Sequence, residues 1–161
     1  MARAGRPIPE GYHTITPQLT VNGAAEAVEF YKRAFGAVEL MRTLGPDGKT
    51  VAHAELKIGD SVVFLSDEFP GMSVKSPSSL GGTTASIYVY VEDADAVFAR
   101  VVAAGAQVQM PVTDMFWGDR MGSVFDPFGY HWAIATHKED LTREELAERQ
   151  AAFYAKMMKG S

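Results

Sequence analysis

The chain has 161 residues, of which 47% are hydrophobic and 22% are charged, as in an ordinary globular protein. It contains no cysteine, which excludes a disulfide scaffold, a thiol nucleophile and a cysteine-bound zinc site. The formal net charge is -5 and no basic run occurs, so we expect no nucleic-acid partner, because binding of phosphates needs clustered Lys and Arg.

The first expected element is a strand over residues 13–21, where Ile15, Leu19 and Val21 alternate with polar residues. A helix is expected next, because apolar residues recur at helical spacing until Gly36 ends the pattern. Three further strands follow, separated by turns that contain Gly and Asp. The helix and these strands cover residues 24–35, 37–44, 51–58 and 61–66. This β-α-β-β-β unit is the first expected module, at residues 12–68.

The same order of elements returns later in the chain. Val21 corresponds to Val91 and Gly59 to Gly129, both at an offset of 70 residues. The repeat predicts a strand, a helix and three strands over residues 85–91, 93–104, 106–112, 120–126 and 130–136. We expect the second module at residues 84–137. Residues 69–83 are rich in Pro, Gly and Ser and are the expected linker.

A C-terminal helix is expected over residues 141–158, because Thr142 and Glu145 form a capping box and apolar residues follow at helical spacing. Its polar face carries both signs of charge, which favours packing on the chain's own domain or on a dimer partner over membrane binding. The chain has no run of 18 apolar residues and no apolar stretch near its first residue. We therefore expect no membrane association and a cytoplasmic location.

Tandem βαβββ modules occur here together with the phrases "EFYKRAFG", "HAELKIGDS", "FWGDR" and "DPFGYHWAIATHKED". In these features the chain resembles the vicinal oxygen chelate superfamily, which includes glyoxalases, bleomycin resistance proteins and dioxygenases, and within it the PhnB-like subgroup. The resemblance implies an α+β fold in which the two modules form an open barrel-like cup with helices outside. It also implies a homodimer, a small-molecule ligand inside the cup and, in the enzymes, a divalent metal held by His, Glu or Gln.

The resemblance implies metal-ligand positions on the first and last strands of each module. These positions are Thr16, Val63, Ser86 and Ala133. A shift of one residue on the last strands would substitute Phe64 or Ile134. Divalent metals need imidazole, carboxylate or amide groups, which none of these side chains has. We therefore expect no metal at these positions and no cofactor, with a divalent metal elsewhere as the alternative.

Strand alternation predicts which side chains line the cup, because every second residue points to the same face. If all four of these positions point inward, namely Thr16, Val63, Ser86 and Ala133, polar and aromatic residues line the cup and apolar residues face the helices. On residues 51–58, the apolar face excludes His53 and Glu55, which then share the other face. The expected ligand-binding residues on the strands are Gln18, His53, Glu55, Tyr88, Tyr90 and His131.

Three of these residues suggest a second metal hypothesis. His53 and Glu55 lie two apart on one strand, and His131 could complete a His/His/carboxylate set. Alternatively, His53 and Glu55 form a hydrogen-bonded pair while His131 caps a turn or meets solvent. Metal-free acid–base chemistry by either histidine, assisted by Glu55, is also open, and no catalytic residue is assigned.

The segment "FWGDR" has two interpretations. Trp117 stacks on a flat ligand at the cup rim while Arg120 pairs with an anionic group. Alternatively, Asp119 and Arg120 bridge the hairpin and Trp117 packs beneath it. The following "DPFG" is expected to be a structural turn, in which Asp126 bonds the next backbone amides.

Together these features predict a glyoxalase- or bleomycin-resistance-like protein that binds a small, partly aromatic or anionic molecule without the family's usual metal site. The alternative is a metal-dependent lyase, isomerase or dioxygenase of the same superfamily with displaced ligands. A third hypothesis is a dimeric scaffold with a vestigial cup. The polar and aromatic lining argues against it, because a vestigial cavity would fill with apolar side chains.

Overall fold

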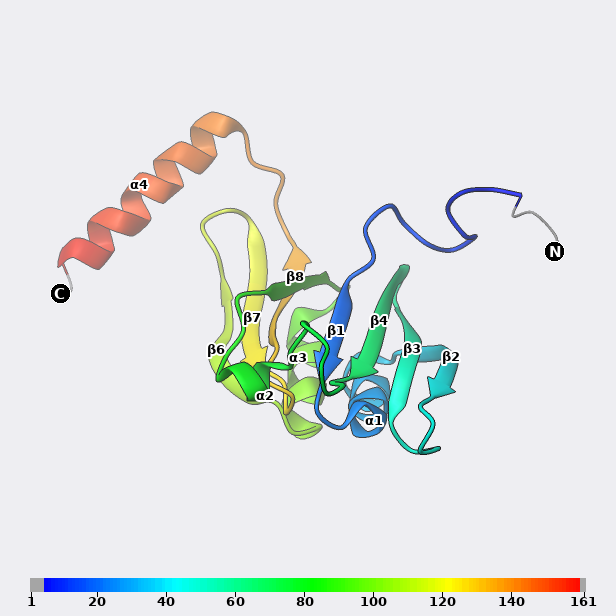
Figure 1. Cartoon of the computed structure of the whole chain (residues 1–161). Coiled ribbons are helices and arrows are strands. Elements are labelled where there is room, and N and C mark those ends of the chain that lie inside the picture. Colours follow the sequence, from blue (N-terminus) through cyan, green and yellow to red (C-terminus); the bar gives the residue numbers. More distant parts are fainter. Residues whose placement is uncertain (1–4, 160–161) are drawn as a thin grey trace.

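The computed structural model describes residues 5–159 and contains two open four-stranded sheets with helices against them (Figure 1). The first sheet has the strand order β1-β4-β3-β2, in which β1 and β4 are parallel. Its module consists of β1 (Gln18–Val21), α1 (Ala24–Phe35), β2 (Val38–Leu44), β3 (Val51–Ile58) and β4 (Ser61–Asp67). α1 buries its apolar stripe and ends at Gly36, whose φ of 67° is left-handed.

The second sheet repeats this plan with the order β5-β8-β7-β6, in which β5 and β8 are parallel. Its module consists of β5 (Ser86–Tyr90), α3 (Ala94–Ala103), β6 (Gln107–Asp114), β7 (Asp119–Phe125) and β8 (His131–His137). The expected α+β fold with two βαβββ units is therefore confirmed. The segment between the units contains one short helix that the sequence did not predict, α2 (Pro77–Leu80). The Ser76 side chain caps α2, and Pro77 occupies its first turn.

β1 is shorter than expected, because residues 13–17 are not part of the strand. The Pro17 carbonyl accepts a hydrogen bond from the Phe64 amide, but proline has no amide hydrogen to donate in return. Ile15 is 83% exposed, so its place in the alternating pattern does not reflect burial. Thr16 therefore lies in an N-terminal arm rather than in a strand.

A single core joins the two modules. It includes residues of α1, α3 and both sheets, and the Arg100 guanidinium on α3 donates to the Ala34 carbonyl near the end of α1 at 2.8 Å. The buried Asp126 carboxylate accepts hydrogen bonds from Tyr31 of α1 at 2.6 Å and from Trp132 of β8 at 2.8 Å. These contacts fix the position of one sheet relative to the other.

The prediction that Val63 points into the cup is wrong. Val63 packs in the core beside the helices, whereas Phe64 contacts His53 and Tyr12 on the opposite face. In the second sheet Ala133 does point away from the core, as expected. The cause is that the two hairpin connections differ in length. The connection from Ile58 at the end of β3 to Ser61 at the start of β4 is short. The connection from Phe125 at the end of β7 to His131 at the start of β8 is longer. Aligning Gly59 with Gly129 therefore matches Val63 to Ala133, whereas the residue of β4 that corresponds to Ala133 in the strand pairing is Phe64.

The C-terminal helix α4 (Arg143–Lys159) projects away from both sheets (Figure 1). Its predicted capping box is confirmed, because the Thr142 hydroxyl accepts from the Glu145 amide and the Glu145 carboxylate accepts from the Thr142 amide. The segment leading to α4 is fixed at Gly118, whose carbonyl accepts from the amides of Lys138 at 2.9 Å and Glu139 at 3.1 Å. Within residues 5–159, no helix has the length and apolar character needed to cross a membrane.

Candidate functional site

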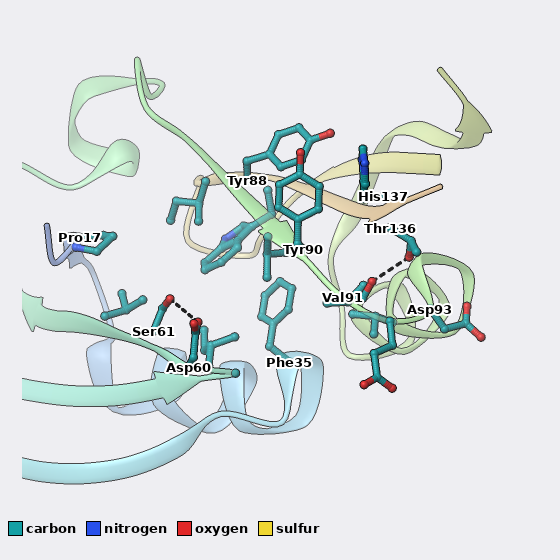
Figure 2. Close-up of a pocket in the computed structure, with 18 of the residues that line it drawn as sticks. Pro17, Phe35, Asp60, Ser61, Tyr88, Tyr90, Val91, Asp93, Thr136 and His137 are labelled. Atoms are coloured by element: carbon teal, nitrogen blue, oxygen red, sulfur yellow. Dashed lines mark hydrogen bonds between the residues drawn. The ribbon is translucent and has the colours of Figure 1, made fainter. Parts of the chain in front are cut away.

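A cleft of about 1250 Å³ lies between the two modules, along the free edge of β5. Because β5 is an edge strand, side chains from both of its faces border the cleft. Ile87 and Val89 contribute the apolar wall together with Phe35 of α1, while Tyr88 and Tyr90 stand at the rim. Figure 2 shows the two tyrosines projecting together from β5, with their hydroxyl groups toward the side where His137 lies.

Beside this rim lies the Asp119 cluster, which comprises Tyr88, Tyr90, Trp117, Asp119 and His137. The Asp119 side chain is only 4% exposed. Its Oδ2 atom accepts from the hydroxyl of Tyr88 at 2.9 Å, the hydroxyl of Tyr90 at 3.0 Å and the indole N–H of Trp117 at 3.2 Å. Its Oδ1 atom lies 2.9 Å from Nδ1 of His137.

The strand register explains how these residues meet. Asp119 begins β7 directly opposite His137, the last residue of β8. Tyr90 is paired with Ala135 in the parallel ladder, two residues before His137 on the same face. The Trp117 loop between β6 and β7 then folds toward the same face, where Trp117 packs against the small apolar cluster of Met121, Ala133 and Ala135.

The hydrogen bonds determine the charge states in the cluster. Burial opposes ionisation of Asp119, but hydrogen bonds from His137, Tyr88 and Tyr90 outweigh it and lower the pKa of the carboxyl group. Burial and the neighbouring carboxylate raise the pKa values of both tyrosines. Hydrogen bonds to Asp140 and then Asp119 raise the pKa of His137. At neutral pH the cluster therefore presents an ionised carboxylate and two neutral phenols.

A second cluster lies on the first sheet, beside a pocket of about 340 Å³. His53 Nε2 lies 3.1 Å from the Glu55 carboxylate, which also accepts from the Tyr12 hydroxyl of the N-terminal arm. The ring of Phe64 packs edge-on against His53 at 4.8 Å between centroids. The hydrogen bond from Tyr12, and then that of His53, lower the pKa of Glu55. Of the two interpretations of His53 and Glu55, the hydrogen-bonded pair is the one observed.

The displaced metal site is not assembled. His131 belongs to the second sheet, where its Nδ1 lies 2.6 Å from the Ser86 hydroxyl and its ring packs on Phe125. In the part of the chain that the structure describes, no three His, Asp or Glu side chains gather closely enough to hold a metal. At the positions implied by the resemblance, Phe64 replaces Val63, and the remaining groups are hydroxyls and a methyl. These residues do not fit a divalent metal.

Arg120 lies on the opposite face of β7 from Asp119. Its guanidinium donates two hydrogen bonds to Asp95 of α3, at 2.6 and 2.7 Å, and one to Asp114 across the hairpin at 3.0 Å. These partners raise its pKa. The structure therefore agrees with the hairpin-bridging interpretation and does not bring Arg120 to the cleft. Gln18 is exposed at the start of β1, opposite Phe64.

Sequence reasoning missed Asp119, His137 and Tyr12 as members of these clusters. Alternation carried a signal for His137, because it shares a face with His131, Ala133 and Ala135 on β8. Asp119 had no such signal, because it stands at a strand end beside Arg120 and looks like half of a surface ion pair. Tyr12 lies before the first strand, where no periodic pattern places its side chain.

Residues 12–134 match the family model of the Glyoxalase/Bleomycin resistance protein/Dioxygenase superfamily, and the chain belongs to this family. An uncharacterized protein of Mycobacterium tuberculosis is 44% identical over 135 residues, covering 82% of this chain and 79% of that protein. The crystal structure of TioX from Micromonospora sp. ML1 has a TM-score of 0.63 at 31% identity, covering 78% of this chain and 98% of TioX. A PhnB protein from Bacillus cereus, at 22% identity and a TM-score of 0.61, shares the fold over 77% of this chain and 99% of its own.

Proposed function

We propose that this chain is a small-molecule binding protein that holds a partly aromatic ligand in the cleft between its modules. The observation that carries the proposal is the cleft itself, with an apolar wall and two tyrosines at its rim. Ligand sites are typically concave and largely apolar, with a few convergent polar groups that fix orientation. The Asp119 cluster supplies such groups beside an apolar wall formed by Phe35, Ile87 and Val89.

The ligand's aromatic part has better support than an anionic part. The expectation of an anionic ligand relied on Arg120, whose guanidinium is engaged by Asp95 and Asp114. An anion at Arg120 would have to displace carboxylates that are already hydrogen bonded to it. The rings of Tyr88 and Tyr90, by contrast, are 42% and 62% exposed and offer faces for stacking.

The binding proposal predicts that Tyr88→Ala weakens binding of aromatic ligands found in a thermal-shift screen. The expected loss is about 1 to 3 kcal/mol, because a stacking face and an ordered hydroxyl disappear together. Isothermal titration calorimetry with the best hit measures the change. Phe125→Ala is the matched control, because Phe125 is an exposed aromatic residue of the same sheet, packed on His131 and not among the residues that line the cleft. Equal affinities for wild type and Tyr88→Ala would contradict the assignment of the cleft as the ligand-binding site.

A metal-dependent lyase, isomerase or dioxygenase is the competing function. We propose that no divalent metal is needed, because the donor groups at the family positions are hydroxyls and hydrocarbon. After incubation with Ni, Co, Mn, Fe and Zn and exhaustive dialysis, elemental analysis should find metal far below one ion per chain. Stoichiometric retention that is lost in His53→Ala would instead establish a metal site and overturn this part of the proposal.

A further inference from the structure

We propose that the ligand carries a hydrogen-bond-donating organic cation, such as an ammonium group on an aromatic body, and that this group binds at the hydroxyls of Tyr88 and Tyr90. The inference rests on the proposed function, because it takes the cleft as the ligand site. It adds the chemical class of the ligand. Three features of the described residues support it: the direction of the hydrogen bonds, the charges around the cleft and the position of the tyrosine rings.

The direction of the hydrogen bonds leaves only acceptors facing the ligand. Each tyrosine hydroxyl has one hydrogen, and in both Tyr88 and Tyr90 the ionised Asp119 carboxylate is in position to accept it. Met121 Sδ lies 3.3 Å from the Tyr88 oxygen, but a thioether is a much weaker acceptor than a carboxylate. The Trp117 N–H is engaged by the same carboxylate. Trp117 also hydrogen bonds to the Tyr88 oxygen, and Tyr88 to the Tyr90 oxygen. Each phenol oxygen has two lone pairs, and the remaining ones can only accept, so a complementary ligand group must donate.

The charges around the cleft favour a positive ligand group. Among residues 5–159, those that line the cleft include Asp60, Glu92 and Asp93 and no Lys or Arg, and Asp119 lies directly behind the tyrosines. His137 is the cationic candidate among the lining residues, but its two ring nitrogens face the carboxylates of Asp119 and Asp140 at 2.9 and 3.0 Å. Asp119 and the lining carboxylates together outnumber this one imidazole, and such an excess of negative charge attracts cations and repels anions.

The tyrosine rings suit the same group. Their centroids are 5.1 Å apart on neighbouring positions of one face of β5, and both rings are partly exposed. The face of an aromatic ring carries a negative quadrupole, so a cation over Tyr88 or Tyr90 gains attraction in addition to its hydrogen bonds. The apolar wall of the cleft suits the flat body of a ligand. The tyrosine hydroxyls, which accept hydrogen bonds, and the nearby carboxylates suit an amine at the end of that body.

Three probes that share one ring system test the charge assignment: 2-naphthylmethylamine, 2-naphthylmethanol and 2-naphthoate. Equilibrium dialysis at pH 7 should show the ammonium probe binding at least about tenfold more tightly than the alcohol, and the carboxylate most weakly. Raising the salt concentration should weaken the ammonium probe more than the alcohol. If the alcohol binds as tightly as the amine, or if the carboxylate binds most tightly, the inference is overturned and the binding proposal stands. If none binds, both are overturned.

Two variants test whether the carboxylates around the cleft cause the preference for the ammonium probe over the alcohol. Asp119→Asn removes the central charge at nearly constant shape and should reduce the preference for amine over alcohol to within about threefold. The double variant Asp60→Asn with Glu92→Gln removes two negative charges from the exposed edge of the cleft and leaves the buried Asp119 unchanged. It should weaken amine binding several-fold even if Asp119→Asn fails to fold. Glu148→Gln on α4 removes one charge far from the cleft and is the matched control. An unchanged preference in the rim variant and in folded Asp119→Asn would refute the assignment.

Discussion

Asp119 is a buried carboxylate that pairs with no Lys or Arg among residues 5–159. Its charge is stabilised by four hydrogen-bonding groups from β5, β8 and the Trp117 loop. Hydrogen bonds of this kind also hold the side chains that donate them, so Tyr88 and Tyr90 keep one orientation at the rim. His137 is half-exposed, and as an imidazole it is the member of the cluster whose charge changes nearest to neutral pH, so solvent pH acts on the others through it.

The raised pKa of His137 gives a pH prediction. Because the folded-state pKa lies above the ordinary value of 6.5, the contribution of this histidine to stability is complete below that pH and is lost as pH rises through the raised value. NMR titration of the ring resonances should therefore give a pKa above 6.5. Asp140→Asn removes its principal partner and should lower it. A His137 pKa at or below 6.5 in the wild-type chain would contradict this prediction.

At this scale the sequence identified three of the five members of the cluster, Tyr88, Tyr90 and Trp117, as candidate binding residues. Alternation along residues 85–91 identifies Tyr88 and Tyr90 as neighbours on one face, because that needs only the two-residue period of a strand. Asp119 and Trp117 belong to a strand end and a loop, whose approach to that face depends on tertiary packing. Local pattern therefore predicts which face a residue occupies, but not which loop closes over that face.

At the scale of elements, the turn after β7 connects more parts of the molecule than its sequence suggests. The predicted bonds from Asp126 to the Phe128 and Tyr130 amides are present, each at 2.9 Å. In addition, the Tyr130 hydroxyl lies 3.1 Å from both the amide and the carbonyl of Thr20 in β1. Gly129 has a φ of 92°, and a Cβ atom there would lie 2.8 Å from Pro77 Cβ in α2. This turn thus contacts both β1 and the segment between the modules.

Gly129→Ala should destabilise the fold by about 2 to 4 kcal/mol, because strain at a left-handed position adds to a contact with Pro77. Gly36→Ala is the matched control. Gly36 has a φ of 67°, and no atom of the described residues lies within 4 Å of its Cβ position, so this substitution should cost only about 1 to 2 kcal/mol. Urea unfolding of both variants measures the difference. Equal losses would mean that the contact with Pro77 carries no energy.

At the scale of the whole molecule, the duplicated βαβββ order was predictable, because hydrophobic periodicity and glycine positions repeat along the chain. The strand register was not, because Val63 and Phe64 are both apolar and only the hairpin lengths determine which of them faces the helices. The arrangement of α4 was not predictable either. Its residues are all exposed, and aromatic contacts with the body join Phe153 and Tyr154 to Phe116.

We propose that a second copy of the chain covers the apolar side of α4, because Phe153 and Tyr154 remain 42% and 51% exposed on a projecting helix. Phe153→Ser with Tyr154→Ser should shift the molar mass toward that of a monomer in light scattering over a concentration series. Glu148→Ser, on the polar side of the helix, should leave the mass unchanged. Identical masses for the full chain and the double variant would exclude α4 as a dimer contact.

Two backbone hydrogen bonds join Gly118 to Lys138 and Glu139, so the loop between β6 and β7 is attached to the segment that leads to α4. A Cβ atom at Gly118 would lie 2.5 Å from the Glu139 carbonyl oxygen. The loop and the segment leading to the helix are therefore packed too closely to admit a side chain at this position. Gly118 is also the neighbour of Trp117, whose indole N–H donates to the Asp119 carboxylate. A side chain at position 118 would therefore disturb the loop that carries Trp117 and the start of the C-terminal segment together.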